Sequence, residues 1–320
     1  MKLVMFGTKD FALPTFLAIL DSDHEVAALV TQPDRPQGRK QELVPSRIKC
    51  AAIERNIAVF QPEDVNALDA LAVIREFAPD LLVTAAYGQI LSAELLGTAL
   101  HGGINLHGSI LPKYRGAAPV ARAIQNGETE AGVTVIRMTP RIDAGGMIAI
   151  GKTLVDPNET AGNLEERLAA LGVPLMRDAI AAIASNTVEM LPQAKARVTR
   201  APKLSKEDGR IDWSKTARVI HNLVRAMNPW PLAETYWHPS DSSKPPVRLI
   251  VHETAISETS GIAGTVLEAK KDRLVIAAAE GSIQLLTLQI SGKRPMSPQE
   301  FLPGHAVRVG DQIGHPSLSP

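Results

Sequence analysis

Short, almost entirely apolar runs alternate with amphipathic stretches through the first 85 residues of this chain. The apolar runs are KLVMF, VAALVT, VF and LLVTA, whereas FALPTFLAIL, SRIKCAAIERN and ALDALAVIREF carry apolar residues at helical spacing. Strands that are apolar on both faces are typical of a parallel sheet covered by helices on both sides. We therefore expect an α/β fold with a Rossmann-like, doubly wound, mainly parallel sheet, whose ligands bind at the carboxyl ends of the strands.

The pattern continues with a predicted strand over 102–107, a helix over 118–125 and strands over 132–138 and 147–155. Two helices are then expected, over 164–171 and 174–184, because Gly172 interrupts the pattern between them.

The composition changes near residue 190, where prolines and basic residues appear without acidic ones. This is typical of a linker. Beyond it, one amphipathic helix is followed by short β-like runs separated by Pro, Gly, Ser and Asp, as in a small β-barrel. A length of 320 residues also suits two domains. We predict a catalytic domain over 1–189, a basic linker over 190–206, an OB-like β-barrel over 207–310 and a tail over 311–320.

Cysteine content and hydrophobicity indicate the compartment. Cys50 is the single cysteine, so an internal disulfide is excluded, which favours a reducing, cytoplasmic setting. The apolar run at the N-terminus is too short for a signal peptide, and about 18 consecutive apolar residues occur nowhere. We therefore expect no membrane association. No cluster of Cys and His has the spacing of a metal site, so no metal is expected.

One nucleotide motif matches by letter only. The sequence GMIAIGKT, from Gly146 to Thr153, fits the pattern of a phosphate-binding loop. Its middle is strand-like, and a proline follows where that motif requires a helix. We therefore interpret the match as accidental.

The stretch INLHGSILPKYRGAAPV, 104–120, contains the residues most suited to chemistry. Residues two apart in a strand share a face, so Asn105 and His107 are expected together at the end of a strand. Asp143 precedes a Gly-Gly turn between two later strands and is expected to reach the histidine. An amide, an imidazole and a carboxylate suit acyl transfer to an amine, which needs donors to an oxyanion and an acceptor for the amine proton. The same residue types are also ordinary turn formers, and spacing alone leaves both interpretations open.

Several motifs resemble those of the tetrahydrofolate-dependent formyltransferases. The signature N-x-H-x-S-x-L-P-x-x-x-G, followed by D-x-G, is matched by the residues from Asn105 to Gly116 and by Asp143-Ala144-Gly145. FGTKDFA, TQPDRPQGRK, VTAAYGQIL, KLSKEDGRIDWS and NPWPLAET extend the resemblance to about residue 310. Combined with the second domain, they most resemble the members that act on the initiator methionyl-tRNA.

The resemblance implies formylation of the α-amino group of methionine on the initiator tRNA, with 10-formyltetrahydrofolate as donor and no metal. It implies that Asn105 and His107 stabilise the oxyanion and that Asp143 orients the imidazole and helps to move the proton. The residues implied for the folate site are Ser109, Ile110, Leu111 and Pro112.

Two basic segments are hidden in a chain whose 34 basic and 34 acidic residues cancel. Residues 31–49 carry five basic and two acidic residues, a net +3, and residues 195–225 carry nine and three, a net +6. Such clusters neutralise phosphates. In the family the first segment resembles the loop that enters the acceptor stem, although Lys40-Gln41-Glu42 is less basic than usual and Lys9 replaces the customary proline. The predicted tRNA contacts are Arg35, Arg39, Lys40, Lys203, Lys206 and Arg210.

Three alternatives stay open. The first is a formyltransferase that acts on a small amine, but such an enzyme would not need the second domain and the basic loop. A 10-formyltetrahydrofolate hydrolase or dehydrogenase fits both domains but not the TQPDRPQGR loop. A non-catalytic RNA-binding module leaves Asn105, His107 and Asp143 without a role. We expect a monomer.

Overall fold

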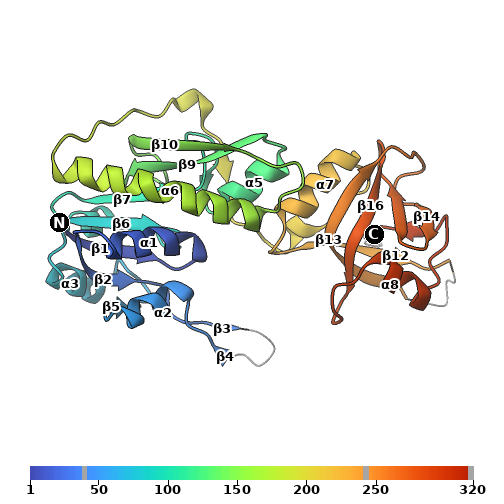
Figure 1. Cartoon of the computed structure of the whole chain (residues 1–320), viewed down its shortest axis with the longest axis horizontal. Helices are drawn as coiled ribbons and strands as arrows, with labels where there is room; N and C mark the ends of the chain where they lie inside the picture. Colours follow the sequence, from blue (N-terminus) through green and yellow to red (C-terminus); the bar gives the residue numbers. More distant parts are fainter. Residues whose placement is uncertain (38–41, 241–244, 316–320) are drawn as a thin grey trace. The chain divides into compact units, whose positions relative to one another are not determined.

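The computed structural model describes residues 1–37, 42–240 and 245–315. The chain divides into two compact units (Figure 1). Met1–Pro119, Glu130–Leu154 and Leu164–Pro202 form the first, and Val120–Thr129, Val155–Asn163 and Lys203–Pro320 form the second. Each unit is thus assembled from three separate stretches of the chain. The borders expected at residues 189, 206 and 310 stay a prediction.

The first unit is built on a seven-stranded sheet in the order β10-β9-β7-β6-β1-β2-β5. Five neighbouring strands, from β5 to β7, run parallel, and at one edge β9 pairs antiparallel with both β7 and β10. The predicted mainly parallel sheet is therefore confirmed. The strands are β1 (Lys2–Gly7), β2 (Glu25–Val30), β5 (Ala58–Phe60), β6 (Leu81–Ala85), β7 (Gly103–His107), β9 (Glu130–Arg137) and β10 (Met147–Leu154).

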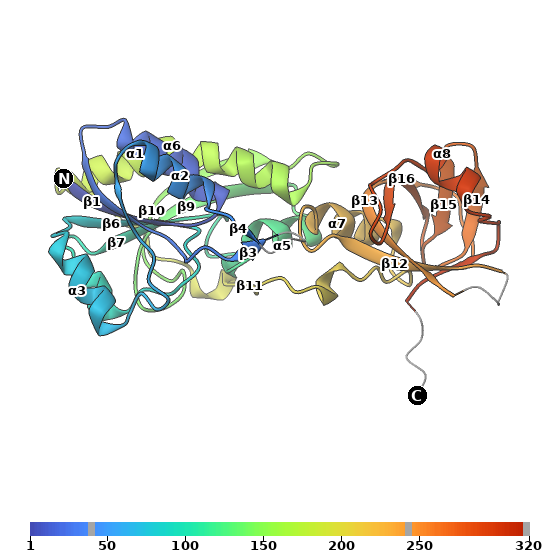
Figure 2. The same cartoon turned by 90° about the horizontal axis from the view of Figure 1, so that it is seen from below.

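Helices cover both faces of this sheet. Figure 2 shows α1 (Leu13–Leu20), α2 (Arg47–Glu54) and α6 (Ala161–Ala184) on one side and α3 (Leu68–Glu76) on the other. Successive residues of β1 are buried on both faces: Val4 and Phe6 pack with Leu71 and Ile74 of α3, and Met5 is as deeply buried. This explains the unbroken apolar runs. The other short helical segments are η1 (Asp10–Ala12), α4 (Ala93–Leu96) and η2 (Lys195–Arg197), while α5 (Pro119–Gln125) belongs almost wholly to the second unit.

The helix break expected at Gly172 is wrong. One helix, α6, runs from Ala161 to Ala184 through both Gly172 and Pro174. A Cβ atom at Gly172 would lie 2.4 Å from Cδ2 of Leu106 on β7. The glycine therefore lets the helix pack closely on the sheet and does not end it. The interpretation of GMIAIGKT as an accidental match is confirmed, because Met147–Leu154 form strand β10.

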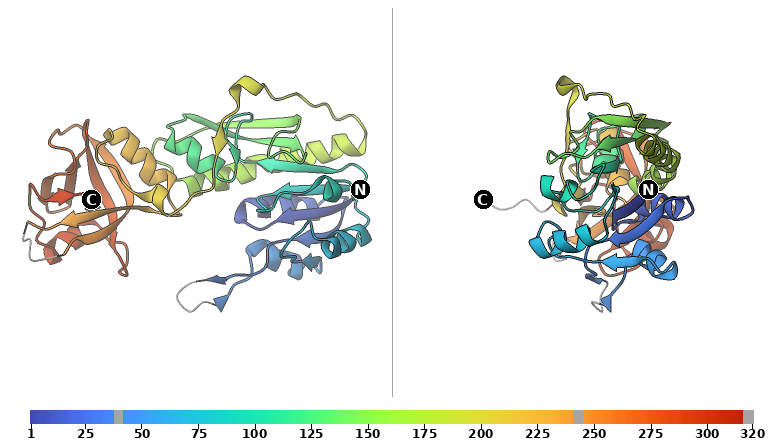
Figure 3. Two further views of the ribbon diagram at one scale, coloured as in Figure 1. Left: turned by 180° about the vertical axis from the view of Figure 1, so that it is seen from behind. Right: turned by 90° about the vertical axis from the view of Figure 1, so that its left-hand side faces the viewer.

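A two-stranded hairpin of β3 (Pro36–Gln37) and β4 (Glu42–Leu43) extends away from the main sheet in Figure 3. A polar network holds its base: Lys49 Nζ donates to Asp34 Oδ2 at 2.5 Å and to Gln61 Oε1 at 2.7 Å. The amide of Gln61 in turn donates to Asp34 Oδ1 at 3.1 Å. Two of the predicted tRNA contacts, Arg39 and Lys40, lie outside the described residues.

The second unit holds the predicted β-barrel. Its antiparallel strands follow the order β14-β15-β16-β13-β12-β17. Val266 N–H donates to the Asp311 carbonyl at 2.9 Å and Ile313 N–H to the Gly264 carbonyl at 2.6 Å, which nearly closes the sheet between β14 and β17. The strands are β12 (Ala233–His238), β13 (Val247–Ser257), β14 (Val266–Lys270), β15 (Arg273–Ala277), β16 (Ser282–Ile290) and β17 (Gln312–Ile313).

Helix α7 (Ala217–Ala226) packs Ile220 and Val224 into the barrel core beside Trp213 and Trp237. The remaining helical turns of this unit are η3 (Glu207–Gly209), α8 (Pro298–Phe301) and η4 (Leu302–Gly304). Among the described helices, none combines the length and apolarity that crossing a membrane requires.

Candidate active site

The order of the strands reverses between β1 and β6. From β1 the chain moves outward to β2 and β5, then returns to β6 on the other side of β1. Such a reversal leaves a gap above the strands in which ligands of open α/β sheets bind. The Thr8 hydroxyl bridges this edge: it donates to the Tyr87 carbonyl at 3.1 Å and accepts from Gln32 N–H at 3.1 Å. Nε2 of Gln32 is buried and has no hydrogen-bond partner among the described residues.

Strand β7, next to β6, carries the two predicted oxyanion donors at this same edge. Asn105 is partly exposed, while Ile104 and Leu106 on either side of it are buried. Within the described part of the chain, no hydrogen bond is recorded for the Asn105 side chain. Its amide therefore has hydrogen-bonding capacity left for a bound molecule.

His107, at the end of β7, is 5% exposed and is held on both sides. Its Nε2 lies 2.9 Å from the Tyr114 carbonyl oxygen. Because a carbonyl only accepts, Nε2 carries the proton of this bond. The other nitrogen, Nδ1, lies 3.5 Å from Oδ2 of Asp143. A proton that reaches Nδ1 therefore has a carboxylate beside it.

Asp143 lies in the loop between β9 and β10 and is 14% exposed through its side chain. This loop leaves β9 at Arg137, which pairs with Ile104 near the start of β7, so it must fold back to bring Asp143 to His107. Oδ2 of Asp143 also accepts from Gly116 N–H at 2.8 Å. The structure thus brings His107 and Asp143 together, as predicted.

The predicted folate segment forms a tight turn after β7. The Leu111–Pro112 peptide is cis. The Thr134 hydroxyl donates to the Ser109 carbonyl at 2.7 Å and accepts from Leu111 N–H at 3.1 Å. The Ser109 hydroxyl donates to the Lys113 carbonyl at 2.7 Å, so it serves the turn itself. Ser109 and Leu111 are buried, whereas Ile110 and Pro112 are partly exposed.

The four predicted tRNA contacts that the structure describes all lie at the surface. Arg35 pairs with Glu63 at 2.6 Å, and both side chains are more than 60% exposed. A surface pair of this kind contributes about 0–1 kcal/mol and does not prevent contact with a phosphate. In the second unit, the side chains of Lys203, Lys206 and Arg210 are exposed.

Comparison with known proteins identifies the family. Residues 1–180 match the model described as "Formyl transferase", and residues 203–306 match "Formyl transferase, C-terminal domain". Methionyl-tRNA formyltransferases of Acetivibrio thermocellus and Moorella thermoacetica are 41% and 39% identical to 98% of this chain, over 100% and 99% of their own lengths. The chain belongs to the formyltransferase family, in the group of the methionyl-tRNA formyltransferases.

Solved structures share the formyltransferase fold. The sugar 3N-formyl transferase WlaRD, determined with dTDP and 5-N-formyl-THF, superposes with a TM-score of 0.65 over 92% of this chain and 99% of its own, at 21% identity. This likeness agrees with the α/β sheet and the barrel described above.

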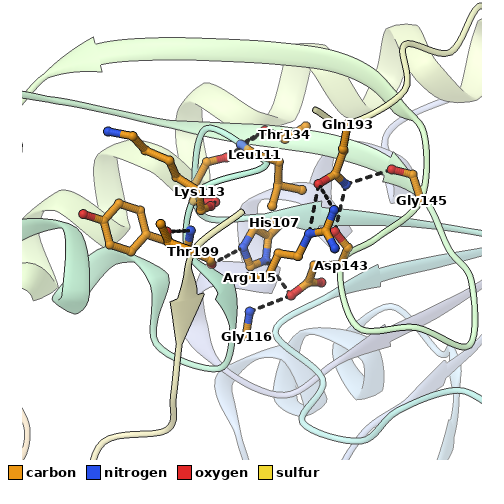
Figure 4. Close-up of polar contacts among 12 residues, drawn as sticks. His107, Leu111, Lys113, Arg115, Gly116, Thr134, Asp143, Gly145, Gln193 and Thr199 are labelled. Carbon is orange, nitrogen blue, oxygen red and sulfur yellow. Dashed lines mark hydrogen bonds and ion pairs between the residues drawn. The ribbon is translucent and has the colours of Figure 1, made fainter. Parts of the chain in front are cut away.

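Sequence reasoning missed the residues that hold the His107–Asp143 pair. Figure 4 shows Arg115 and Gln193 beside Asp143, with Gln193 hydrogen-bonded to both Arg115 and the Gly145 carbonyl. Composition placed Gln193 in a linker, and no local pattern distinguishes it from a solvated polar residue. Of the three tryptophans, Trp213 and Trp237 are buried in the barrel core, whereas Trp230 is 52% exposed.

Proposed function

We propose that this formyltransferase transfers the formyl group of 10-formyltetrahydrofolate to the α-amino group of methionyl initiator tRNA. The observation that carries the proposal is an Asn105 amide without a hydrogen-bond partner among the described residues, beside buried His107 and partly buried Asp143, at the edge where an α/β sheet binds its ligands. The curated relatives named methionyl-tRNA formyltransferase support the choice of substrate.

The reaction is a transfer between two nitrogens. The amine nitrogen attacks the formyl carbon, the bond between that carbon and N10 of the folate breaks, N10 gains a proton and the amine loses one. Negative charge develops on the formyl oxygen, and a donor aimed at that oxygen lowers the barrier. In our proposal the Asn105 amide is this donor, with His107 beside it.

Asp143 and His107 act together on the proton. The Tyr114 carbonyl fixes the imidazole through Nε2, so Nδ1 faces the Asp143 carboxylate. We assign to this pair the uptake of the amine proton, a general-base role that needs an acceptor held close to the reacting nitrogen.

The donor would bind at the carboxyl ends of β1, β6 and β7. Partly exposed Ile110 and Pro112 would contact the folate, while buried Ser109 and Leu111 would shape the turn. The Gln32 amide nitrogen, which has no hydrogen-bond partner among the described residues, offers a further hydrogen bond to a ligand there. The tRNA would bind through Arg35, Arg39 and Lys40 and through Lys203, Lys206 and Arg210. We place the reaction in the cytoplasm, catalysed by a monomer.

The direct test uses purified protein, 10-formyltetrahydrofolate and initiator tRNA charged with labelled methionine. We expect the label to appear as formylmethionine attached to the tRNA. Formate released at the same rate without tRNA, and no formylated aminoacyl-tRNA, would instead identify a hydrolase. Formylation of a small sugar amine in preference to charged tRNA would identify a small-amine formyltransferase.

A further inference from the structure

The segment 193–201, whose composition indicates a solvated linker, is ordered against the active site. Residues Arg200–Ala201 form strand β11, which pairs in parallel with β8 (Arg115–Gly116). Tyr114 N–H donates to the Thr199 hydroxyl at 2.8 Å, and Arg115 N–H donates to the Thr199 carbonyl at 2.9 Å. The segment therefore acts as a clamp on residues 114–116, as Figure 4 shows for Thr199.

The clamped residues are those that contact the catalytic pair. The Tyr114 carbonyl binds His107 Nε2, and Gly116 N–H binds the Asp143 carboxylate. Gly116 has φ +127°, and a Cβ atom there would lie 2.5 Å from the Ala201 carbonyl oxygen. The close approach of the clamp therefore requires a glycine at this position.

Gln193 joins the clamp to the Asp143 loop. Its Nε2 donates to the carbonyls of Asp143 and Gly145, both at 2.8 Å. Its Oε1 accepts from Nε and Nη2 of Arg115, at 3.0 and 2.6 Å. The amide thus uses both of its protons and accepts two hydrogen bonds. It is half-buried, whereas the residues on either side of it are exposed.

The backbone of Asp143 needs such support. Its φ is +48°, in the left-handed region, which residues other than glycine adopt uncommonly although Asp is among those that tolerate it best. The two hydrogen bonds from Gln193 bracket this residue at its own carbonyl and at that of Gly145. Arg115, on the strand next to Gly116, holds the other end of the same amide.

We propose that Gln193 is a positioning residue for formyl transfer: it fixes the Asp143 loop so that the carboxylate faces His107 Nδ1. The inference rests on the proposed function. Gln193 contacts neither substrate in this role and acts only through Asp143. Loss of its donors would therefore slow the chemical step and leave the binding of both substrates nearly unchanged.

Two variants test the role. Gln193→Glu keeps an oxygen for Arg115 but replaces the donor to Asp143 and Gly145 with a second oxygen, whereas Gln193→Ala removes both interactions. We expect both variants to lower kcat about 10- to 100-fold, the scale of a misplaced catalytic group. The KM values for 10-formyltetrahydrofolate and for methionyl-tRNA should change by less than about twofold, because uniform binding is untouched.

A matched control separates positioning from general stability. Gln289→Glu makes the same change in the second unit, at a glutamine whose amide also donates to a backbone carbonyl, that of Lys293 at 2.5 Å. The change in Tm of this variant should be similar to that of Gln193→Glu, whereas its kcat should equal that of the wild type. A wild-type kcat in Gln193→Glu, or a KM effect equal to the kcat effect, would overturn the inference. Failure of the wild-type protein to formylate the tRNA would instead overturn the proposed function.

Discussion

Asn105 and His107 lie two residues apart on β7, but their side chains differ in how far the rest of the protein fixes them. Both ring nitrogens of His107 face fixed neighbours, the Tyr114 carbonyl and the Asp143 carboxylate. Asn105 is partly exposed, and within the described residues its amide makes no recorded hydrogen bond. The imidazole is thus held in place before a ligand binds, whereas the donors of the Asn105 amide remain free to bind the ligand.

Asn105→Ala therefore provides the sharpest test at the residue scale. We expect kcat to fall by about 10²–10³-fold, the usual effect of removing one donor to an oxyanion. Tm should change little, because the side chain is partly exposed and makes no hydrogen bond to another described residue. Steady-state kinetics and thermal unfolding of the same preparation measure both effects. An unchanged kcat would remove the oxyanion role from Asn105.

At the scale of elements, α6 shows how packing decides what a glycine does. Gly172 costs about 1 kcal/mol of helix propensity relative to alanine. Its missing side chain, however, lets α6 approach Leu106 of β7. The helix continues because contact with the sheet offsets the local penalty.

Gly172→Ala should therefore destabilise the protein although alanine favours helices. The added Cβ would meet Leu106 Cδ2 at 2.4 Å, and overpacking typically costs 1–3 kcal/mol, more than the gain of about 1 kcal/mol in propensity. Urea unfolding measures the balance. The double variant with Leu106→Ala should be more stable than the sum of the two single changes predicts, since the space removed by one is returned by the other. Strict additivity would argue against the clash.

The base of the β3–β4 hairpin depends on a titratable pair. The hydrogen bond from Lys49 lowers the pKa of Asp34 below its ordinary value, and a bond from Gln61 adds to this shift against the opposing effect of burial. A carboxyl group whose folded pKa is depressed stabilises the protein above its unfolded pKa of about 4. That contribution is lost as the pH falls through the folded pKa.

Asp34→Asn is expected to reduce the free energy of unfolding at pH 7 by about 0.5 kcal/mol, the size of a partly exposed pair. The difference from wild type should begin to shrink near pH 4, where Asp34 of the unfolded chain takes up a proton, and should be lost as the pH falls through the lower pKa of the folded carboxyl group. Urea unfolding at several pH values follows this change. A difference that stays constant down to acid pH would show that Asp34 does not act through its charge.

At the scale of the whole molecule, the zero net charge is the sum of two basic segments and an acidic remainder. Residues 31–49 and 195–225 together carry +9, so the remaining residues sum to −9. An acidic remainder with two basic segments is suited to a polyanion that binds in defined places. Trp230, 52% exposed in the second unit, adds an aromatic surface of the kind on which bases stack.

Replacing Lys203, Lys206 and Arg210 together with alanine should weaken tRNA binding and flatten its dependence on salt. Each lost phosphate contact lowers the slope of log K against log salt concentration by about 0.7–0.9. The KM for 10-formyltetrahydrofolate should not change. Lys270, Lys271 and Lys293, exposed lysines of the same unit, provide a control triple alanine variant with the same change of charge. An equal effect of both variants, or an effect on folate alone, would refute the assignment.

The sequence by itself determined the local features. Periodicity predicted the strands and most helices, because burial on one or two faces of an element sets the spacing of its apolar residues. The spacing of Asn105 and His107 likewise predicted that both lie at the end of one strand. Family motifs indicated Asp143, but only the tertiary structure explains how its loop folds back to reach His107. Gln193 lies 50 residues from Asp143 and 78 from Arg115 along the chain. The role of Gln193 and the continuity of α6 past Gly172 both depend on residues far away in the sequence that pack against them. A local sequence pattern contains no information about such long-range contacts.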